Sequence, residues 1–448
     1  MEEDKSRRTW KSGGVRYRAD RGVWIASREL EPDKRGRRVR IEASGKTESA
    51  AIAALNKKYR DRTRNKPVAS QKGSVKEYLD RWMESVCRPN SRPATYDAYA
   101  HAIDRYINPA IGSLKMRSVN VESIRNMRQE VIRICEKANA EARKSGSSKT
   151  ISGVSRANYC QAVLAAAFTD AMREGVMEYN PASSQYVKRA KKSQDSILTL
   201  SSSQAKALIA SAVKAGDPMA SRWATALITG TRQGETIGLQ WSRVDFENKK
   251  IHFTKQLVKL TKKHGCGKRD QGEWPCGYKF PTKCPNATID ASPEYLEQCD
   301  ILDGDFVLGP TKTARSARAI PMPPPLEKIL RHHRAVTAND YNPHDLVWHR
   351  PDGMPFSRGV DHMNWKEALD TAGLERVRLH SARHTAASLM ADMGVDRQVV
   401  MEIFGHTTES TTATYTHLSE SLQREALEQL SGDILDMFAN EDGVWELE

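Results

Sequence analysis

The sequence lacks the features that would direct a chain into or across a membrane. No window approaches the roughly 18 consecutive apolar residues of a membrane-spanning helix. The N-terminus is polar and charged and has no apolar signal-peptide core. The seven cysteines are odd in number and irregularly spaced, which argues against a secreted disulfide framework. These absences predict a cytoplasmic protein without a membrane partner.

Positive charge is what the sequence has in excess. The formal net charge of +14 favours a polyanionic partner, although solvated basic faces would give the same total. Residues 1–70 contain 20 Lys and Arg against 10 Asp and Glu, whereas residues 416–448 contain one Arg against nine Asp and Glu. This asymmetry predicts nucleic-acid binding near the N-terminus and a different role for the acidic tail.

Residues 1–64 predict a small domain of three strands and one helix. Two β-rich runs flank a turn at Asp20-Arg21-Gly22, a third follows, and an Ala-rich helix begins after Thr47. Arginines alternate with the strand residues, as in a sheet that enters a major groove, and a basic accessory surface is the alternative. The predicted DNA contacts are Arg16, Arg18, Arg38 and Arg40.

Residues 74–187 predict an all-α domain, because apolar side chains recur there at helical spacing. The linker after it carries four basic residues, which predict contacts with DNA phosphates; a solvated charged face is the alternative. These residues are Lys188, Arg189, Lys191 and Lys192. Residues 197–418 combine helices with strands near 244–254 and 317–323, and predict a mainly helical domain with a small antiparallel sheet.

Five basic side chains in this last domain precede one tyrosine, each in a distinctive local sequence. They are Arg232 in TGTRQGETIGLQW, Lys312 in PTKTARSARAIPM, His380 and Arg383 in LHSARHTAASLM, and His406 in FGHTTESTTATYTHL, which also contains Tyr415. A single Arg, Lys or His in a basic protein is more often a surface or structural residue. Together, however, these residues fit a site for a pentavalent phosphate with a tyrosine nucleophile.

The cations divide into phosphate ligands and proton carriers. Arg232 and Arg383 are predicted to bind the phosphate, because a guanidinium forms bidentate bonds and keeps its charge. Glu235 lies three residues after Arg232 and is predicted to orient it. His406 is predicted to donate a hydrogen bond to the phosphate.

The remaining roles concern the nucleophile and the leaving group. Tyr415 is predicted to attack once neighbouring cations favour its phenolate. His380 is the candidate proton acceptor, and Lys312 the candidate acid that protonates the leaving 5′ oxygen. Because a tyrosine ester conserves the bond energy, this chemistry requires no cofactor.

These motifs resemble those of the tyrosine recombinases, also called the phage integrase family. The resemblance covers residues 197 to about 420, with His384 as the usual neighbour of Arg383. Residues 74–186 look like the family's core-binding domain, and residues 10–63 resemble the arm-binding domains of phage and conjugative-element integrases.

The resemblance implies an enzyme that cleaves and rejoins double-stranded DNA through a 3′-phosphotyrosine. It would integrate or excise a phage or mobile element as a homotetramer on core-type and arm-type sites. A host bending factor and an excision directionality factor are the further partners that this resemblance suggests. A type IB topoisomerase and a catalytically inactive architectural DNA-binding protein are the alternatives.

Two segments leave further alternatives open. A cysteine-containing insertion at about residues 258–308 departs from the family pattern, and it makes Lys279 and Lys283 competitors of Lys312. Cys266, Cys276 and Cys284 are weak zinc candidates, but the insertion has no CxxC pair, so a loop with incidental cysteines is favoured. The tail at 419–448 predicts an amphipathic helix, with docking on a neighbouring subunit slightly favoured over packing on its own domain.

Overall fold

The computed structural model describes residues 14–30, 39–63, 73–146, 150–190, 198–270, 272–311, 316–405 and 420–435. The chain divides into two compact units, each of which is described by itself. The first consists of Met1–Asn90 and Thr95–Lys192, and the second of Ser91–Ala94 and Ser193–Glu448. None of the helices within the described ranges combines the length and apolarity that a membrane-spanning segment needs.

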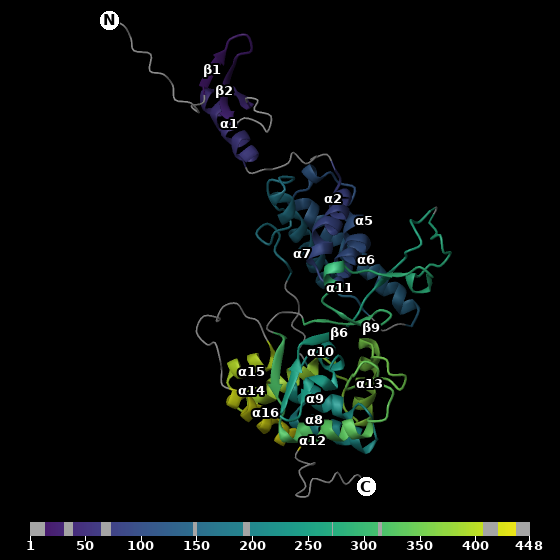
Figure 1. Cartoon of the computed structure of the whole chain (residues 1–448). Helices are drawn as coiled ribbons and strands as arrows, with labels where there is room; N and C mark the ends of the chain where they lie inside the picture. The colour runs from purple at the N-terminus through teal and green to yellow at the C-terminus, as the bar shows by residue number, and fades with distance from the viewer. Residues whose placement is uncertain are drawn as a thin grey trace. The chain divides into compact units, whose positions relative to one another are not determined.

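The N-terminal part of the first unit is the predicted three-stranded sheet with one helix (Figure 1). The strands are β1 (Gly14–Arg18), β2 (Val23–Leu30) and β3 (Val39–Gly45), antiparallel in the order β1-β2-β3. Helix α1 (Glu48–Thr63) covers one face, where Ala26, Ile41, Ala51 and Leu55 form a small core. The alternation of a strand leaves the opposite face to polar side chains.

The rest of the first unit is helical, as predicted. Its longer helices are α2 (Val75–Trp82), α4 (Pro93–Ala102), α6 (Val121–Lys144) and α7 (Gly153–Arg173). A π-helical turn carries α2 into α3 (Arg88–Asn90), and another carries α4 into α5 (Asn108–Ile111). Ser74 begins α2 with a capping box: its hydroxyl accepts from the Glu77 amide, and the Glu77 carboxylate accepts from the Ser74 amide. Tyr78, Trp82 and Phe168 belong to the buried core of this helical part.

The second unit is built mainly from helices around one large hydrophobic core. The helices are α8 (Ser202–Lys214), α9 (Ala220–Thr229), α10 (Gln233–Ile237), α12 (Pro324–Val336), α13 (Arg358–Thr371), α14 (Ser381–Asp392), α15 (Arg397–Phe404) and α16 (Glu420–Leu435). Trp223 of α9 and Trp365 of α13 meet edge to face in the core, with ring centroids 5.3 Å apart. Figure 1 shows α9 in the middle of this helical layer.

Two small antiparallel sheets complete the second unit. The first has the order β11-β5-β4, from β11 (Arg318–Pro321), β5 (Lys250–Phe253) and β4 (Val244–Asp245). This sheet confirms the strands predicted near 244–254 and 317–323. The second has the order β6-β10-β9, from β6 (Lys255–Lys259), β10 (Phe306–Pro310) and β9 (Asp300–Asp303). Strands β6 and β10 form the base of the cysteine-containing insertion, which also holds α11 (Pro293–Leu296) and the short pair β7 (Lys262–Lys263) and β8 (Thr288–Ile289).

The described part of the acidic tail packs on its own unit. Helix α16 buries Ala426, Leu427, Leu430, Ile434 and Leu435 within the same core as α8 and α9. Of the two arrangements that the sequence allowed, residues 420–435 therefore adopt packing on their own domain in the single chain. The predicted helix residue Phe438 lies outside the described residues.

Candidate active site

The site begins where α9 ends, at a glycine that no other residue could replace without strain. Gly230 has a φ of 57°, and a Cβ placed there would lie 2.3 Å from Cε1 of Phe404. The left-handed turn ends the helix, so the chain reverses into α10 with Arg232 as its N-cap residue. The close approach of Gly230 to Phe404, at the end of α15, thus fixes the backbone position of Arg232.

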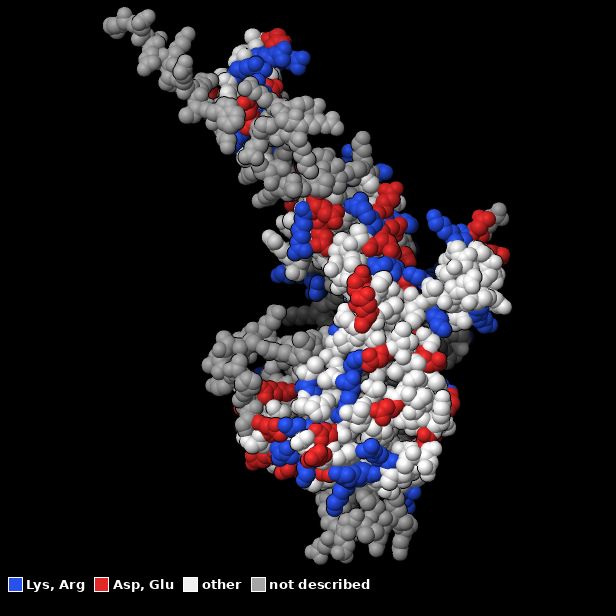
Figure 2. Space-filling view, in the orientation of Figure 1, with Lys and Arg blue, Asp and Glu red and all other residues white. Residues whose placement is uncertain are grey.

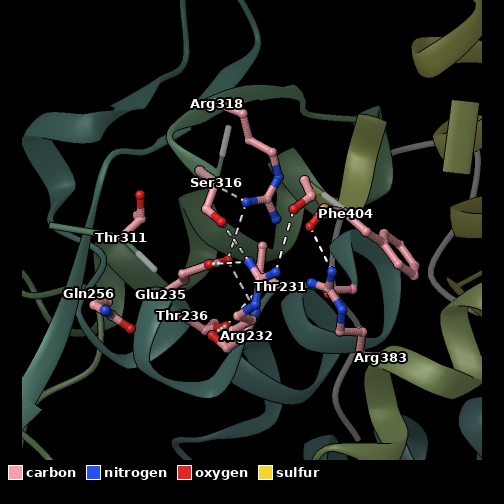
Figure 3. A network of polar contacts seen from close by, with 12 residues as sticks. Thr231, Arg232, Glu235, Thr236, Gln256, Thr311, Ser316, Arg318, Arg383 and Phe404 are labelled. Carbon is pink, nitrogen blue, oxygen red and sulfur yellow. Dashed lines mark hydrogen bonds and ion pairs between the residues drawn. The ribbon is translucent and has the colours of Figure 1, made fainter. Parts of the chain in front are cut away.

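Glu235 holds two arginines from distant parts of the sequence (Figure 3). Its side chain is fully buried. Nη1 of Arg232 donates to Glu235 Oε1 at 2.8 Å, and Nη1 of Arg318 donates to Oε2 at 3.3 Å. The predicted pairing of Arg232 with Glu235 is confirmed. One carboxylate therefore sets the positions of two guanidinium groups.

Carbonyl oxygens at two helix C-termini hold the arginines from the other side. Arg383, in the first turn of α14, donates to Gly230 O and Phe404 O, both at 2.7 Å. Nε of Arg318 donates to Ile403 O at 2.6 Å. Carbonyls at a helix C-terminus carry partial negative charge, so they stabilise buried cations without neutralising them. Figure 3 shows Arg232, Arg318 and Arg383 gathered around this point.

The cluster has an excess of positive charge that an anion would balance. Three guanidinium groups face one carboxylate, since Arg232, Arg318 and Arg383 surround Glu235. Burial, together with the smaller effect of the charges of Arg232 and Arg318, lowers the pKa of Arg383 to about 9. The guanidinium still carries its charge at neutral pH. Burial also lowers the pKa of Arg318. An incoming phosphate would relieve this repulsion.

His380 lies directly before α14 and keeps contact with solvent. Partial burial, which removes water from the ring, lowers the pKa of His380. The nearby charges of His384, Arg383 and Arg232 lower it to a smaller extent. The rings of His380 and His384 meet edge to face with centroids 5.0 Å apart. A histidine with a lowered pKa is neutral at pH 7, which is the form that accepts a proton.

The other three predicted catalytic residues, Lys312, His406 and Tyr415, lie outside the described residues. Their described neighbours in the sequence nevertheless contact the site. The hydroxyl of Ser316 accepts from Arg232 Nη1 at 3.0 Å, and Gly405 O accepts from Arg232 Nη2 at 3.4 Å. The chain on the C-terminal side of Lys312 and on the N-terminal side of His406 is therefore fixed at the same guanidinium.

Arg318 is a member of the site that the sequence did not reveal. It belongs to SARAIPM, where strand alternation marks every second residue but does not say which arginine turns inward. Its side chain is only 9% exposed, and Nη1 also donates to Ser316 O at 2.8 Å. An arginine within a predicted strand next to a catalytic motif is the signal that could have singled it out.

Comparison with known proteins identifies the family. The model of the phage integrase family matches residues 295–421, and that of the phage integrase N-terminal SAM-like domain matches residues 74–132. The chain belongs to the phage integrase family.

Relatives match nearly the whole integrase-family chain. An integrase of Saccharopolyspora erythraea is 24% identical over 451 residues, covering 96% of this chain and 98% of its own length. A tyrosine recombinase XerC-like protein of Caldanaerobacter subterraneus subsp. tengcongensis is 26% identical over 415 residues, covering 89% and 93%. The solved Tn1549 transposon integrase in complex with transposon right end DNA is 16% identical with a TM-score of 0.54, covering 80% of this chain and 99% of its own. That structural likeness concerns the fold.

The N-terminal arginines of this phage-integrase-family chain share the sheet face that α1 leaves open. Arg16 on β1 and Arg40 on β3 both pair with Glu42, at 3.7 and 3.4 Å. Arg18 pairs with Asp20 at 3.1 Å. All three arginine side chains are exposed, and Figure 2 shows basic side chains gathered at this end of the sheet. Arg38 lies outside the described residues.

The remaining predicted positions fall in the linker and the cysteine-containing insertion. Lys188 and Arg189 are exposed, whereas Lys191 and Lys192 lie outside the described residues. The sequence favoured incidental cysteines in the insertion. The structure instead brings Cys266, Cys276 and Cys284 together with His264, and all four ligand atoms lie within 4.8 Å of one another. Turns, and not a CxxC knuckle, bring these residues together, so their spacing in the sequence did not predict that they would meet.

Proposed function

We propose that this chain is a site-specific DNA recombinase that integrates or excises a phage or mobile element, with Tyr415 as its nucleophile. The observation that carries the proposal is the convergence of Arg232, Arg318 and Arg383 around the buried carboxylate of Glu235. Such a cluster suits a phosphodiester, which gains negative charge as the nucleophile enters. Membership of the phage integrase family supports the same reaction.

The arginines supply most of the stabilisation of the transition state. Arg232 is the more accessible, with 26% of its side chain exposed, and its further N–H groups would donate to a non-bridging oxygen. Arg383 is anchored by two carbonyls and retains further N–H groups for the second oxygen. Arg318 positions Glu235 and Ser316. His406, one residue after Gly405, donates a third hydrogen bond to the phosphate.

The cleavage step exchanges one phosphoester for another. The Tyr415 oxygen attacks phosphorus and forms an O–P bond, and its phenolic proton passes to neutral His380. The bond from phosphorus to the 5′ oxygen breaks, and Lys312 protonates the departing oxygen. The products are a 3′-phosphotyrosine and a free 5′ hydroxyl. In strand exchange, the 5′ hydroxyl of the partner duplex attacks the phosphotyrosine, forms the new phosphodiester and releases Tyr415. Since one ester replaces another, no cofactor enters the balance.

DNA is the proposed partner along the whole chain. Residues 197–418 would act on the core site together with the helical domain 74–187, and Lys188, Arg189, Lys191 and Lys192 would follow the phosphates between them. Residues 1–64 would bind arm-type DNA through Arg16, Arg18, Arg38 and Arg40. The Tn1549 transposon integrase, which was solved with transposon DNA, supports this choice of partner.

Strand exchange between two duplexes calls for four active sites, so we propose a homotetramer on DNA. The tail at 419–448 is divided in this proposal: residues 420–435 stay on their own domain, and the last residues dock on a neighbour. A host bending factor and an excision directionality factor are proposed as further partners.

A nicked suicide substrate tests the proposed chemistry. The substrate carries a core site, selected by sequencing the DNA that the full-length chain retains, with a nick that lets the short fragment bearing the free 5′ hydroxyl diffuse away after cleavage. Wild-type protein is expected to accumulate a covalent adduct, whereas Tyr415→Phe forms none while binding the same DNA. Absence of an adduct on every selected site would overturn the enzymatic proposal in favour of an architectural DNA-binding protein.

The same preparation separates a recombinase from a type IB topoisomerase. Two duplexes with complementary overlap regions are incubated with the protein, and products are resolved on a denaturing gel. Recombinant strands of exchanged length are expected. Relaxation of supercoiled plasmid of any sequence, with no exchanged strands, would support the topoisomerase alternative.

A further inference from the structure

We infer that the cysteine-containing insertion holds a structural zinc ion, with His264, Cys266, Cys276 and Cys284 as its four ligands. The inference adds a metal site to the chain and is independent of phosphoryl transfer. It starts from the convergence of four soft or borderline ligand atoms, all within 4.8 Å of one another.

The distances match a tetrahedral zinc site. Zinc bonds of about 2.3 Å to sulfur and about 2.0 Å to nitrogen place ligand atoms about 3.5–3.8 Å apart in a tetrahedron. Nδ1 of His264 lies 3.4 Å from Cys276 Sγ and 3.9 Å from Cys266 Sγ. Three thiols and one imidazole form a donor set that selects zinc over hard cations such as calcium and magnesium.

Strand pairing and a close backbone approach bring these ligands together. Strands β7 and β8 pair Lys262 with Ile289 and Lys263 with Thr288, so the two arms of the insertion meet just before His264 and just after Cys284. A Cβ at Gly265 would lie 2.0 Å from Asn286 O, which shows how tightly the arms approach. The third ligand segment enters through a turn in which the Gly277 amide donates to Trp274 O.

The imidazole is held in the orientation that the site requires. The His264 ring stacks on Trp274 with centroids 4.1 Å apart and an interplanar angle of 12°. This stacking fixes the ring plane while Nδ1 faces two thiols. Because Trp274 lies only two residues before Cys276, one short turn supplies both a ligand and the surface that orients another.

The insertion has little else to hold it in one conformation. Among the described residues from 261 to 294, Cys284 alone has a buried side chain. A segment of this length without a hydrophobic core cannot offset the entropy of ordering its backbone, and small domains of this kind usually depend on a metal or on disulfides. All seven cysteines are free, so no disulfide supplies the constraint.

A fourth cysteine of the same insertion provides the internal comparison. Cys299 does not belong to the cluster, and its thiol donates to Tyr295 O at 3.2 Å. It packs in the small core of Leu260, Tyr295 and Val307. In Figure 2 the lobe at the right of the view is mostly uncharged, with basic and acidic side chains at its margins.

Metal analysis of the full-length chain tests the inference. The protein is purified under reducing conditions, its affinity tag is removed, and its metals are measured by inductively coupled plasma mass spectrometry. The wild type is expected to contain about one zinc per chain. Cys276→Ser is expected to lose nearly all of it, and the matched variant Cys299→Ser to keep it.

Two further readouts protect the test against a misfolded variant. Cys276→His replaces sulfur by another zinc ligand and is expected to retain the metal, whereas a fold-dependent loss would affect it like Cys276→Ser. Cobalt(II) exchanged into the wild type is expected to show the intense visible absorption of tetrahedral thiolate coordination. Chelation is expected to open the insertion to trypsin at Lys268 and Arg269, with the rest of the chain protected.

Several outcomes would overturn the inference. They are zinc absent from the reduced wild type, equal zinc in Cys276→Ser and the wild type, and a stoichiometric metal other than zinc. A disulfide between two of Cys266, Cys276 and Cys284 in freshly purified protein would likewise assign the cluster to redox chemistry and not to a metal.

Discussion

The buried carboxylate of Glu235 accepts a 2.8 Å hydrogen bond from Arg232 Nη1, within one turn of the same short helix. The other oxygen of Glu235 serves Arg318, which comes from a strand 83 residues later in the sequence. The arginine cluster is thus organised by one acid. Its behaviour on substitution follows from that arrangement.

Replacement of this acid is expected to damage both stability and activity. Glu235→Gln removes the charge that compensates Arg318, whose side chain is 9% exposed, so we expect a loss of about 3–5 kcal/mol in the free energy of unfolding. The exposed Glu247→Gln should change stability by less than about 0.5 kcal/mol. The free energy of unfolding of the two variants is compared by denaturant titration, and adduct formation is measured in parallel. Equal stability of both variants would remove Glu235 from its organising role.

Alanine substitutions at Gly230 and Gly216 distinguish the cost of backbone strain from the cost of a steric clash. Gly230 and Gly216 have φ values of 57° and 65°, but a Cβ at Gly216 meets nothing within 4 Å. Gly216→Ala should therefore cost about 1–2 kcal/mol, the strain of the left-handed conformation alone. Gly230→Ala should cost clearly more and should slow cleavage, because Phe404 must move. Similar losses in the two variants would contradict the tight packing of Gly230 on Phe404.

Arg318 is expected to matter although no sequence motif marked it. Arg318→Lys keeps the charge but offers a single Nζ in place of the separate Nη1, which donates to Glu235 and Ser316, and Nε, which donates to Ile403, so we expect a cost of about 2–3 kcal/mol. The matched change Arg376→Lys affects an exposed pair with Asp370 and should cost less than about 1 kcal/mol. Thermal unfolding and the adduct rate of both variants give the answer. An Arg318→Lys enzyme as stable and active as the wild type would exclude the proposed positioning role.

The pH dependence of cleavage should report on His380. Burial lowers its pKa in the folded protein, so the neutral, proton-accepting form persists below the ordinary pKa of about 6.5. Adduct formation should be constant between that value and neutral pH, and it should fall as the pH drops through the lowered pKa. The sign follows from the neutral form being the active one. The measurement is a pH–rate profile under single-turnover conditions, and an acid limb centred above pH 6.5 would contradict the assignment.

The acidic tail should contribute to stability through its own domain. Leu427 is fully buried and Leu422 is 43% exposed on the same helix. Leu427→Ala should cost about 2–5 kcal/mol, and Leu422→Ala should be close to neutral. Unfolding of the monomeric protein at low concentration is the appropriate assay. A loss for Leu427→Ala that appears only at concentrations where the chain self-associates would restore the docking of this helix on a neighbour.

Local patterns were sufficient to predict the elements and one pair within the site. Alternation predicted the strands that became β1 to β3, and the spacing of Arg232 and Glu235 predicted their contact. The four cationic motifs each specify a short backbone geometry, so their residues could be named from the sequence. These features depend on residues only a few positions apart, so they can be read from the sequence alone.

Contacts that depend on chain register or on turns could not be predicted in the same way. The place of Arg318 depends on the pairing of β11 with β5, and the bonds of Arg383 depend on where α9 and α15 end. The cysteines of the insertion are separated by seven and nine residues and meet only because β7 and β8 close the loop. Such long-range arrangements leave no periodic trace in the sequence.

Tyr415 is the residue that we expect to form the covalent bond to DNA. The most direct measurement is to trap the adduct on the suicide substrate, digest it with nuclease and trypsin, and locate the residual nucleotide by tandem mass spectrometry. We predict a nucleotide phosphate on the oxygen of Tyr415, attached through the 3′ end of the cleaved strand. A phosphate on another residue, or a linkage through the 5′ end, would exclude Tyr415 as a nucleophile that takes up the 3′ phosphate.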